Sequence, residues 1–408
     1  MSTVQQLIGF ARVQSARRVV RETDAETLRQ MAELVEIPAP PFGEEARGRY
    51  VLQQFRDLGL RDVHRDDAGN VIGMLPDAAE PDAGPVVVAA HLDTVFDEHT
   101  DVRLRREGDR WCAPGISDNV RGLAALLAMA RGFKQTSVRT RRPLALVASV
   151  GEEGIGDLRG MKHLFRPDGP WRRAAAFLAI DGAGLDRIID RGVGSRRYRA
   201  TVRGEGGHSW SDWGIANPIH AVGNAVAELM RLRLRRAPRT VLSVTRTGGG
   251  TSVNAVPQAA WIEMDLRSES EQALARLDRR VQETLRRAVS AAARRRRRGT
   301  AGLDLDVQSI GQRPAGRTQD AALLKAAVAA TRAVGGRPDH TASSTDANVP
   351  MSLGIPAICV GAGGQAGGMH TLNEWYTNDA GPEGIERVLL IVLATTGVAQ
   401  TAHPRGPR

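Results

Sequence analysis

The sequence predicts an α/β protein, with a mostly parallel sheet flanked by helices and a smaller α+β domain inserted into it. Apolar runs without polar alternation occur at 85–90, 144–150 and 175–180, as expected of strands covered on both faces. Helical patterns separate these runs, and alternating strands and helices are typical of parallel sheets. From 193 to 311 polar and apolar residues alternate within the strand-like segments, which favours a sheet with one open face.

The outer parts of the chain carry most of the helical patterns. Segments 24–37 and 44–60 have the spacing of amphipathic helices, and 120–133 is apolar on all sides, as in a buried helix. After residue 312 the buried pattern returns, with a helix at 320–335, a strand at 356–363 and a closing helix from 384. We therefore predict one discontinuous domain, formed by residues 1–192 and 312–408.

The inserted segment, 193–311, is predicted to be a small α+β sandwich of two strand–helix–strand halves. Its expected strands and helices follow in chain order: a strand at 195–206, a helix at 217–236, strands at 240–247 and 259–268, a long helix at 270–298 and a strand at 303–310.

The composition of the chain bears on its class of partner. The chain has 408 residues and a formal net charge of +10, which raises the question of an acidic partner. Two arginine-rich runs, at 231–236 and 294–298, lie on segments predicted as helices, and we interpret them as solvated helix faces. Nucleic-acid binding is the alternative, but no zinc finger, recognition helix or aromatic platform accompanies the charge. We therefore expect no nucleic-acid partner.

The two cysteines, Cys112 and Cys359, have neither metal-binding spacing nor a disulfide pattern. The N-terminal residues lack the apolar core of a signal peptide. No apolar stretch reaches the roughly 18 residues that a membrane span needs. We expect a cytoplasmic protein without a membrane partner.

Acidic and histidine side chains follow the predicted strands. Because ligands gather beyond the carboxyl ends of the strands in open α/β sheets, these side chains should meet at one edge. Each has an ordinary interpretation when taken alone, such as a helix cap or a satisfied polar group. Their occurrence at successive strand ends favours a shared site, and its members are His91, Asp93, Asp118, Glu152, Glu153, Asp181 and His370.

The adjacent acids Glu152 and Glu153 lie at the end of a strand that is predicted to be buried. Burying a carboxylate without a partner is costly, and burying two side by side costs more. A pair of divalent cations would neutralise them, and mixed imidazole and carboxylate ligands suit zinc.

Seven motifs follow one another along the chain: "HLDTV", "SDNVRG", "GEEGIG", "AIDGAG", "GEGGHSW", "SVNAVP" and "GGMHTLNEWY". In this order they resemble the co-catalytic dizinc metallopeptidase family of tripeptidase T, carboxypeptidase G, aminoacylase, succinyl-diaminopimelate desuccinylase and acetylornithine deacetylase. The resemblance runs from about residue 20 to 400 and implies a zinc-exopeptidase-like fold with an inserted lid or dimerisation domain.

The resemblance implies two zinc ions per chain, with cobalt or manganese as possible substitutes. His91 and Asp181 would bind the first zinc, Glu153 and His370 the second, and Asp118 would bridge them. The family also has a cis peptide after the bridging aspartate, here Asp118–Asn119.

Two further roles follow from the same resemblance. Glu152 would be the general base rather than a ligand, accepting a proton from a water and returning it to the leaving amine. Asp93 would hydrogen-bond the far nitrogen of His91 and fix its tautomer.

The lid would supply the rest of the site. His208 would enter the partner subunit's site in a homodimer and stabilise the oxyanion, and Asn254 and Arg267 would hold the substrate's carboxylate. In the loop "SSTDAN" we single out Asp346 as a substrate-binding residue. Trp210 and Trp213 have two interpretations, as residues that line the cleft or that pack within the lid.

The sequence therefore predicts a metal-dependent hydrolase of an amide bond in a small, carboxylate-bearing substrate. Within that class "GGGTSVNAVP" and "SSTDANVP" favour a peptidase-T-like exopeptidase, and an N-acyl-amino-acid deacylase is the alternative. An inactive protein on the same fold is the remote alternative, and it is disfavoured because every matched ligand position is filled.

Overall fold

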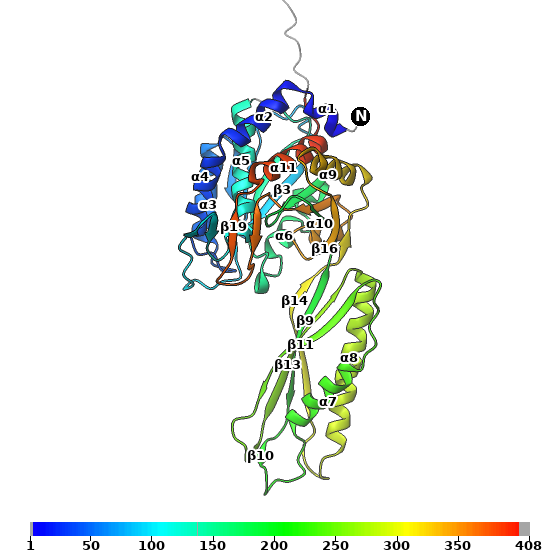
Figure 1. Ribbon diagram of the computed structural model, residues 1–408. Helices are drawn as coiled ribbons and strands as arrows, with labels where there is room; N and C mark the ends of the chain where they lie inside the picture. The colour runs from blue at the N-terminus through cyan, green and yellow to red at the C-terminus, as the bar shows by residue number, and fades with distance from the viewer. Residues whose placement is uncertain (1–2, 137, 400–408) are drawn as a thin grey trace, which may run out of the picture. The chain divides into compact units, whose positions relative to one another are not determined.

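The computed structural model describes residues 3–136 and 138–399. The chain forms two compact units (Figure 1). The larger unit consists of residues 1–192 and 317–408, and the inserted unit of residues 193–316. The inserted unit thus extends beyond the predicted boundary at residue 311, because its last strand continues to Arg313.

The main sheet of the larger unit has parallel strands at its centre. The spatial order is β1-β2-β6-β3-β7-β17-β8-β15, and β16 pairs with β8. The pairs β3–β6, β3–β7, β7–β17 and β8–β16 are parallel, which confirms the predicted fold class. The strands are β1 (Arg61–Arg65), β2 (Val71–Met74), β3 (Val86–His91), β6 (Leu144–Ser149), β7 (Ala176–Ile180), β8 (Arg187–Gly192), β15 (Gly316–Arg317), β16 (Asp339–Ser343) and β17 (Ala357–Val360).

Helices cover both faces of this sheet (Figure 1). Alternate residues of β3 face opposite sides: Val86 and Val88 belong to one apolar cluster, and Val87 and Ala89 to another. The first cluster is completed by α1 (Thr3–Ile8), α2 (Ala11–Glu22), α3 (Asp24–Val35), α4 (Glu45–Asp57), α5 (Arg121–Thr136), α9 (Ala321–Ala333) and α11 (Gly381–Thr396), and the second by α6 (Arg159–Leu164) and α10 (Asn348–Ser352).

A small second sheet, absent from the sequence prediction, joins distant segments of the larger unit. Its order is β18-β19-β5-β4. Pairing of Trp375 with Cys112 brings the "MHTLNEW" segment against the chain that leads to Asp118. The strands are β4 (Arg105–Glu107), β5 (Arg110–Cys112), β18 (Gln365–Gly367) and β19 (Trp375–Thr377).

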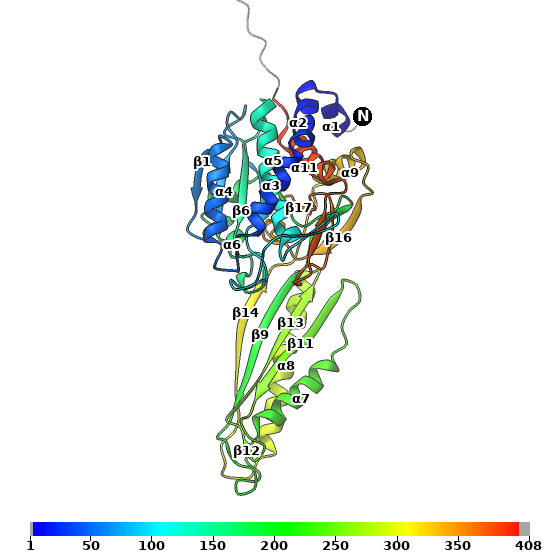
Figure 2. The same cartoon turned by 60° about the vertical axis from the view of Figure 1, so that its left-hand side comes forward.

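The inserted unit is a four-stranded antiparallel sheet of order β11-β13-β9-β14. Apolar residues from one face of this sheet form a core with two helices (Figure 2). The elements are β9 (Gly194–Arg203), α7 (Pro218–Met230), β11 (Thr240–Gly249), β13 (Ala259–Ser268), α8 (Glu271–Arg294) and β14 (Asp304–Arg313), with a two-stranded ladder of β10 (Gly207–His208) and β12 (Ala255–Val256).

Both arginine runs differ from the prediction that they lie on helices. Helix α7 ends at Met230, and 231–236 is irregular. Leu232 and Leu234 alternate with arginines in this run and pack on the core, and a period of two suits an extended chain better than a helix. The run 294–298 begins at the last residue of α8.

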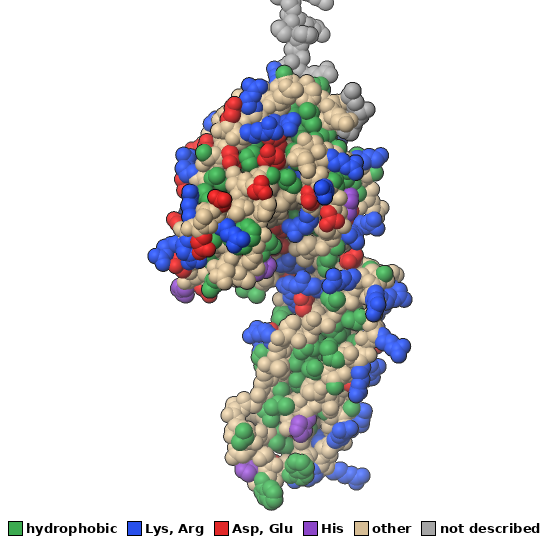
Figure 3. Space-filling model, in the orientation of Figure 1, with side chains coloured by type: hydrophobic (Ala, Val, Ile, Leu, Met, Phe, Trp, Pro, Cys, Tyr) green, Lys and Arg blue, Asp and Glu red, His purple; other side chains and the backbone are tan. Residues whose placement is uncertain are grey.

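The positive charge of the protein is concentrated in the inserted unit, whose basic residues are all arginine. Arginine side chains gather along its α8 side (Figure 3). In the described part of the chain no helix is both long and apolar enough to cross a membrane.

Candidate metal centre

Five side chains from five separate segments of the larger unit meet at one edge of the main sheet. His91 ends β3, Glu153 follows β6 and Asp181 follows β7. Strands β6 and β7 lie on either side of β3 and run parallel to it, so the carboxyl ends of all three open on the same side. Asp118 lies in the turn before α5, and His370 lies in the loop before β19.

Asp118 stands between the two histidines. Its Oδ1 is 3.0 Å from Nε2 of His91, and its Oδ2 is 3.1 Å from Nε2 of His370. His370 Nε2 is also 3.0 Å from Oε1 of Glu153, and His91 Nε2 is 3.9 Å from Oδ1 of Asp181. Ligand atoms of His91, Asp118 and Glu153 all lie within 4.8 Å of one another. The five predicted ligands are therefore together, with one oxygen of Asp118 toward each imidazole.

The electrostatics of this cluster favour positive charge. Hydrogen bonds to Asp118 and Glu153 raise the pKa of His370 to about 10. Burial acts to lower the pKa of His91, but its hydrogen bond to Asp118 and the nearby carboxylate of Asp181 outweigh this and raise that pKa well above the ordinary value. Burial likewise acts to raise the pKa of Asp118, and the two histidines hold it well below its usual range. Such a site attracts protons or cations.

Asp93 holds the turn that contains the adjacent acids. Its Oδ1 accepts the backbone N–H of Glu152 at 2.9 Å, and its Oδ2 accepts that of Glu153 at 2.7 Å. The predicted contact to Nδ1 of His91 is made instead by the backbone carbonyl of Asp93, at 2.9 Å, while the carboxylate lies 3.7 Å away. The predicted residue therefore contacts His91 through its backbone and not its side chain, because the carboxylate already accepts two amide N–H groups.

Asn119 connects the Asp118 turn to the Asp181 turn. Its Nδ2 donates to the carbonyl of Ile180 at 2.7 Å, and its Oδ1 accepts the backbone N–H of Gly182 at 3.3 Å. The Asp118–Asn119 peptide is cis, as the resemblance implied. The role of Asn119 was missed, as was that of Glu374, a buried residue that contacts the Asp118 turn. Both belong to motifs that the sequence singled out, and position within a motif was the only available signal.

Asp346 is buried in the larger unit, with its Oδ2 2.5 Å from the Ser149 hydroxyl. Burial raises the pKa of its carboxyl group to about 6. Its observed partner is a side chain at the end of β6, and the role of Asp346 in substrate binding stays a prediction.

His208 lies on an exposed turn of the inserted unit. Its Nδ1 accepts the backbone N–H groups of Trp210 and Ser211 at 3.2 and 3.3 Å. With Nδ1 used as an acceptor, the proton of the neutral ring is on Nε2, which is left as a donor. The Asp212 carboxylate accepts the backbone N–H of His208 at 2.7 Å and fixes the turn.

The other predicted lid residues divide into two groups. The carbonyl of Asn254 accepts the N–H of Ser209 at 2.9 Å, so Asn254 is next to His208. Arg267 is near the opposite end of the sheet, where it pairs with Ser195 at the start of β9. Along β13, Ala259 and Arg267 are eight positions apart, which corresponds to about 26 Å at roughly 3.3 Å per residue. One inserted unit therefore cannot bring His208 and Arg267 to the same small substrate.

Trp210 and Trp213 follow His208 closely in the chain and have most of their surface exposed, at 86% and 79%. They do not pack within the inserted unit, which removes one of the two interpretations left open by the sequence.

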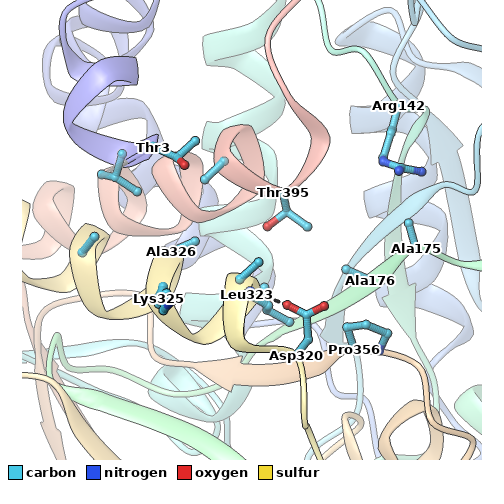
Figure 4. Close-up of a pocket in the computed structure, with 14 residues that line it drawn as sticks. Thr3, Arg142, Ala175, Ala176, Asp320, Leu323, Lys325, Ala326, Pro356 and Thr395 are labelled. Carbon is cyan, nitrogen blue, oxygen red and sulfur yellow. Dashed lines mark hydrogen bonds between the residues drawn. The ribbon is translucent and has the colours of Figure 1, made fainter. Parts of the chain in front are cut away.

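A cavity of about 510 Å³ lies elsewhere in the larger unit, among α1, α9 and α11 (Figure 4). Ala176, the first residue of β7, and Pro356, just before β17, line it. These are the amino ends of strands whose carboxyl ends lead to the metal cluster, so the cavity is separate from it.

Known proteins resemble this chain in sequence and in fold. The chain is 27% identical over 288 residues to the cytosol non-specific dipeptidase of Escherichia coli, a match that covers 62% of this chain and 56% of that protein. It is 28% identical over 285 residues to a putative succinyl-diaminopimelate desuccinylase of Mycobacterium tuberculosis, covering 68% and 74%. The structure resembles the aminopeptidase PepT of Bacillus cereus with a TM-score of 0.72 and 22% identity, covering 90% and 98%.

The family model of peptidase family M20/M25/M40 matches residues 87–394. This match takes in well over half of the 408 residues and confirms the family that the motifs predicted. The chain therefore belongs to peptidase family M20/M25/M40, a family of amide-bond hydrolases.

Proposed function

We propose that the protein hydrolyses the amide bond of a small, carboxylate-bearing substrate at a centre of two divalent cations. The observation that carries the proposal is Asp118, whose two oxygens face two different imidazoles at 3.0 and 3.1 Å. A carboxylate in this position is suited to bridging two cations, with His91 and Asp181 on one side and Glu153 and His370 on the other.

The residues present fit such a centre. Three carboxylates and two imidazoles converge there, and nitrogen and oxygen donors of this kind suit zinc, with cobalt and manganese as substitutes. Bound cations would polarise the substrate carbonyl and make a water easier to deprotonate.

The side chains of the protein itself would then move the proton and hold the substrate. Glu152 is buried beside Glu153, and it acts as general base toward the attacking water and returns the proton to the leaving amine. The Nε2–H of His208 donates to the carbonyl oxygen as that oxygen gains negative charge. Asn254 and Arg267 hold the substrate carboxylate, for which a guanidinium offers two parallel hydrogen bonds.

The separation of His208 from Arg267 supports a homodimer. If both act on one substrate molecule, they must come from different copies of the chain. We propose that each site takes His208 and Asn254 from the partner subunit and Arg267 from its own chain, with the inserted unit forming the dimer interface. Exposed Trp210 and Trp213 would then be covered by the other copy.

A peptide is the favoured substrate, in a cytoplasmic exopeptidase of the peptidase-T-like branch. The motifs "GGGTSVNAVP" and "SSTDANVP" and the structural similarity to PepT support this choice. An N-acyl amino acid is the alternative, supported by the 28% identity to the putative desuccinylase.

The test is metal analysis combined with a substrate panel. The protein, stripped of metal and reloaded with Zn²⁺, Co²⁺ or Mn²⁺, is assayed on dipeptides, tripeptides and N-acyl amino acids, with Glu152→Gln as a matched inactive control. We expect two metal equivalents per chain and turnover of peptides. Turnover confined to N-acyl amino acids would establish the alternative, and the absence of metal binding and of all turnover would refute the proposal.

A further inference from the structure

Glu374 is a fully buried glutamate in the segment that also contains His370. Its Oε1 accepts three hydrogen bonds: from the backbone N–H of Ser117 at 2.8 Å, the hydroxyl of Ser117 at 2.6 Å and the backbone N–H of Asp118 at 3.0 Å. Its Oε2 accepts the backbone N–H of Gly115 at 2.9 Å. One carboxylate thus holds the main chain on both sides of Ser117, directly before the metal-bridging position.

The same residue ties two distant segments together through its backbone. The carbonyl of Glu374 accepts the N–H of Ala113 at 3.1 Å, and the next residue, Trp375, pairs with Cys112. The segment that carries Asp118 is therefore fixed to the segment that carries His370 by both main-chain and side-chain contacts of Glu374.

The loop at His370 needs such support. His370 has a φ of 62°, in the left-handed region that residues other than glycine rarely adopt. Its side chain is half exposed, and its Nε2 faces both Asp118 and Glu153. A loop with this strained backbone and a half-exposed side chain keeps its conformation only where neighbouring contacts hold it.

Burying the Glu374 carboxylate costs free energy, so its presence here indicates that its contacts serve a purpose. A buried carboxylate loses its hydration, and the four hydrogen bonds described here all come from neutral donors. Removing this acceptor would leave several buried N–H groups unpaired, which is more damaging than the loss of one surface contact.

We propose that Glu374 is a positioning residue that sets the metal affinity of the centre, by fixing the backbone of Asp118 relative to the loop of His370. The inference rests on the proposed two-cation centre and assigns Glu374 no contact with metal or substrate. Partners that orient metal ligands typically change metal affinity or activity by 10- to 100-fold when they are mutated.

The chain offers a matched control for this test. Glu386 is an equally buried glutamate of the same unit, but it pairs with Arg17 at 2.7 Å and with Arg21, away from the metal cluster. Glu386→Gln therefore reports the general effect of neutralising a buried glutamate. In Glu374→Gln the amide nitrogen must face an N–H donor, because both oxygens of the native carboxylate are acceptors.

The measurements are made on metal-free protein. Zinc affinity is obtained by competition with a chromophoric chelator, and the visible spectrum of the cobalt-loaded protein reports the geometry of the ligands. We expect zinc binding to weaken by about 10- to 100-fold in Glu374→Gln, with an altered cobalt spectrum. Glu386→Gln should lower the melting temperature while zinc affinity and the cobalt spectrum stay as in wild type.

Ser117→Ala keeps the measurement possible if Glu374→Gln does not fold. This variant removes only the hydroxyl donor at 2.6 Å and should weaken zinc binding severalfold. Unchanged zinc affinity in folded Glu374→Gln would overturn the inference. If only Ser117→Ala folds, unchanged zinc affinity in that variant would overturn it. An equal loss of zinc affinity in Glu386→Gln would overturn it as well. If the wild-type protein itself bound no metal, the proposed two-cation centre would be refuted. Failure of the proposed centre is thus distinguished from failure of the role of Glu374, which is tested in a wild type that binds metal.

Discussion

The Oδ2 of Asp93 accepts the backbone N–H of Glu153 at 2.7 Å. This bond joins the carboxyl ends of β3 and β6. Because the N–H of Glu152 also donates to Asp93, the orientation of both acids depends on one carboxylate. Successive side chains of an extended segment point to opposite sides, so fixing this backbone would let Glu153 face the proposed metal site and keep Glu152 available for its proposed role as base.

Asp93→Asn should impair the centre although Asp93 contributes no metal ligand in our proposal. The amide nitrogen cannot accept an N–H, so one of the two bonds at 2.9 and 2.7 Å is lost. We expect metal affinity or kcat/KM to fall by about 10- to 100-fold. Chelator competition measures metal affinity, and steady-state kinetics measure kcat/KM. Unchanged values in a correctly folded variant would show that the turn of Glu152 and Glu153 does not depend on the Asp93 carboxylate.

Glu152→Gln should keep its metal and lose its activity. The amide is close in shape to the carboxylate but cannot take a proton from water, and general acid–base catalysis typically contributes about 10²- to 10⁴-fold to rate. Metal content is measured alongside turnover. Near-native turnover with full metal content would mean that another group is the base.

Asp118→Ala should lose both metal ions. Each oxygen of Asp118 faces a different imidazole, so removal of this one side chain affects both halves of the cluster. Elemental analysis after gel filtration provides the measurement. Retention of two equivalents per chain would exclude a bridging role.

Metal binding should release protons and become tighter as the pH rises. In the metal-free protein the pKa of His370 is raised to about 10, so the imidazole is protonated at neutral pH and must lose this proton to bind a cation. For each proton displaced, the apparent affinity changes about tenfold per pH unit below that pKa. Calorimetric titrations at pH 6 to 8, in buffers of different ionisation enthalpy, count the protons, and His370→Ala should release fewer.

The same shift has a consequence for the stability of the metal-free protein, with a definite sign. A histidine whose pKa is raised by folding stabilises the fold fully below its unfolded pKa, near 6.5. That contribution is lost as the pH rises through about 10. Metal-free wild type and His370→Ala should therefore differ in melting temperature at neutral pH and converge above pH 10.

Mixing two inactive variants tests whether His208 acts in the partner's site. In a mixed dimer of Glu152→Gln and His208→Ala, one of the two sites combines an intact Glu152 with an intact His208 from the other chain. Random exchange of subunits should then restore about a quarter of wild-type turnover in a two-fold symmetric dimer. If His208 acts within its own chain, every site contains a defect and the mixture stays inactive.

The tautomer of His208 can be tested separately. Ser211→Pro removes one of the two N–H donors to Nδ1, at 3.3 Å. Nitrogen chemical shifts of the imidazole should change from the Nε2–H form toward a mixture of tautomers, and kcat should fall with metal content unchanged. An Nδ1–H ring in wild type would contradict the assignment.

The amino-acid sequence by itself determined the family, the class of fold and the five side chains that meet at the proposed metal site. Apolar strands such as 85–90 and 144–150 must be buried on both faces, and parallel strands present their carboxyl ends at one edge. His91 and Glu153 are therefore brought together by a pattern that is visible locally along the chain.

Only the tertiary structure decided what holds those side chains in place. The carboxylate of Asp93 serves two amides of the neighbouring strand, and the carboxylate of Glu374 serves a turn more than two hundred residues earlier in the chain. Such contacts depend on the pairing of short distant strands like β5 and β19, which carry too few residues for a recognisable pattern. Likewise, the distance between His208 and Arg267 follows from strand register, which no local property of either residue encodes.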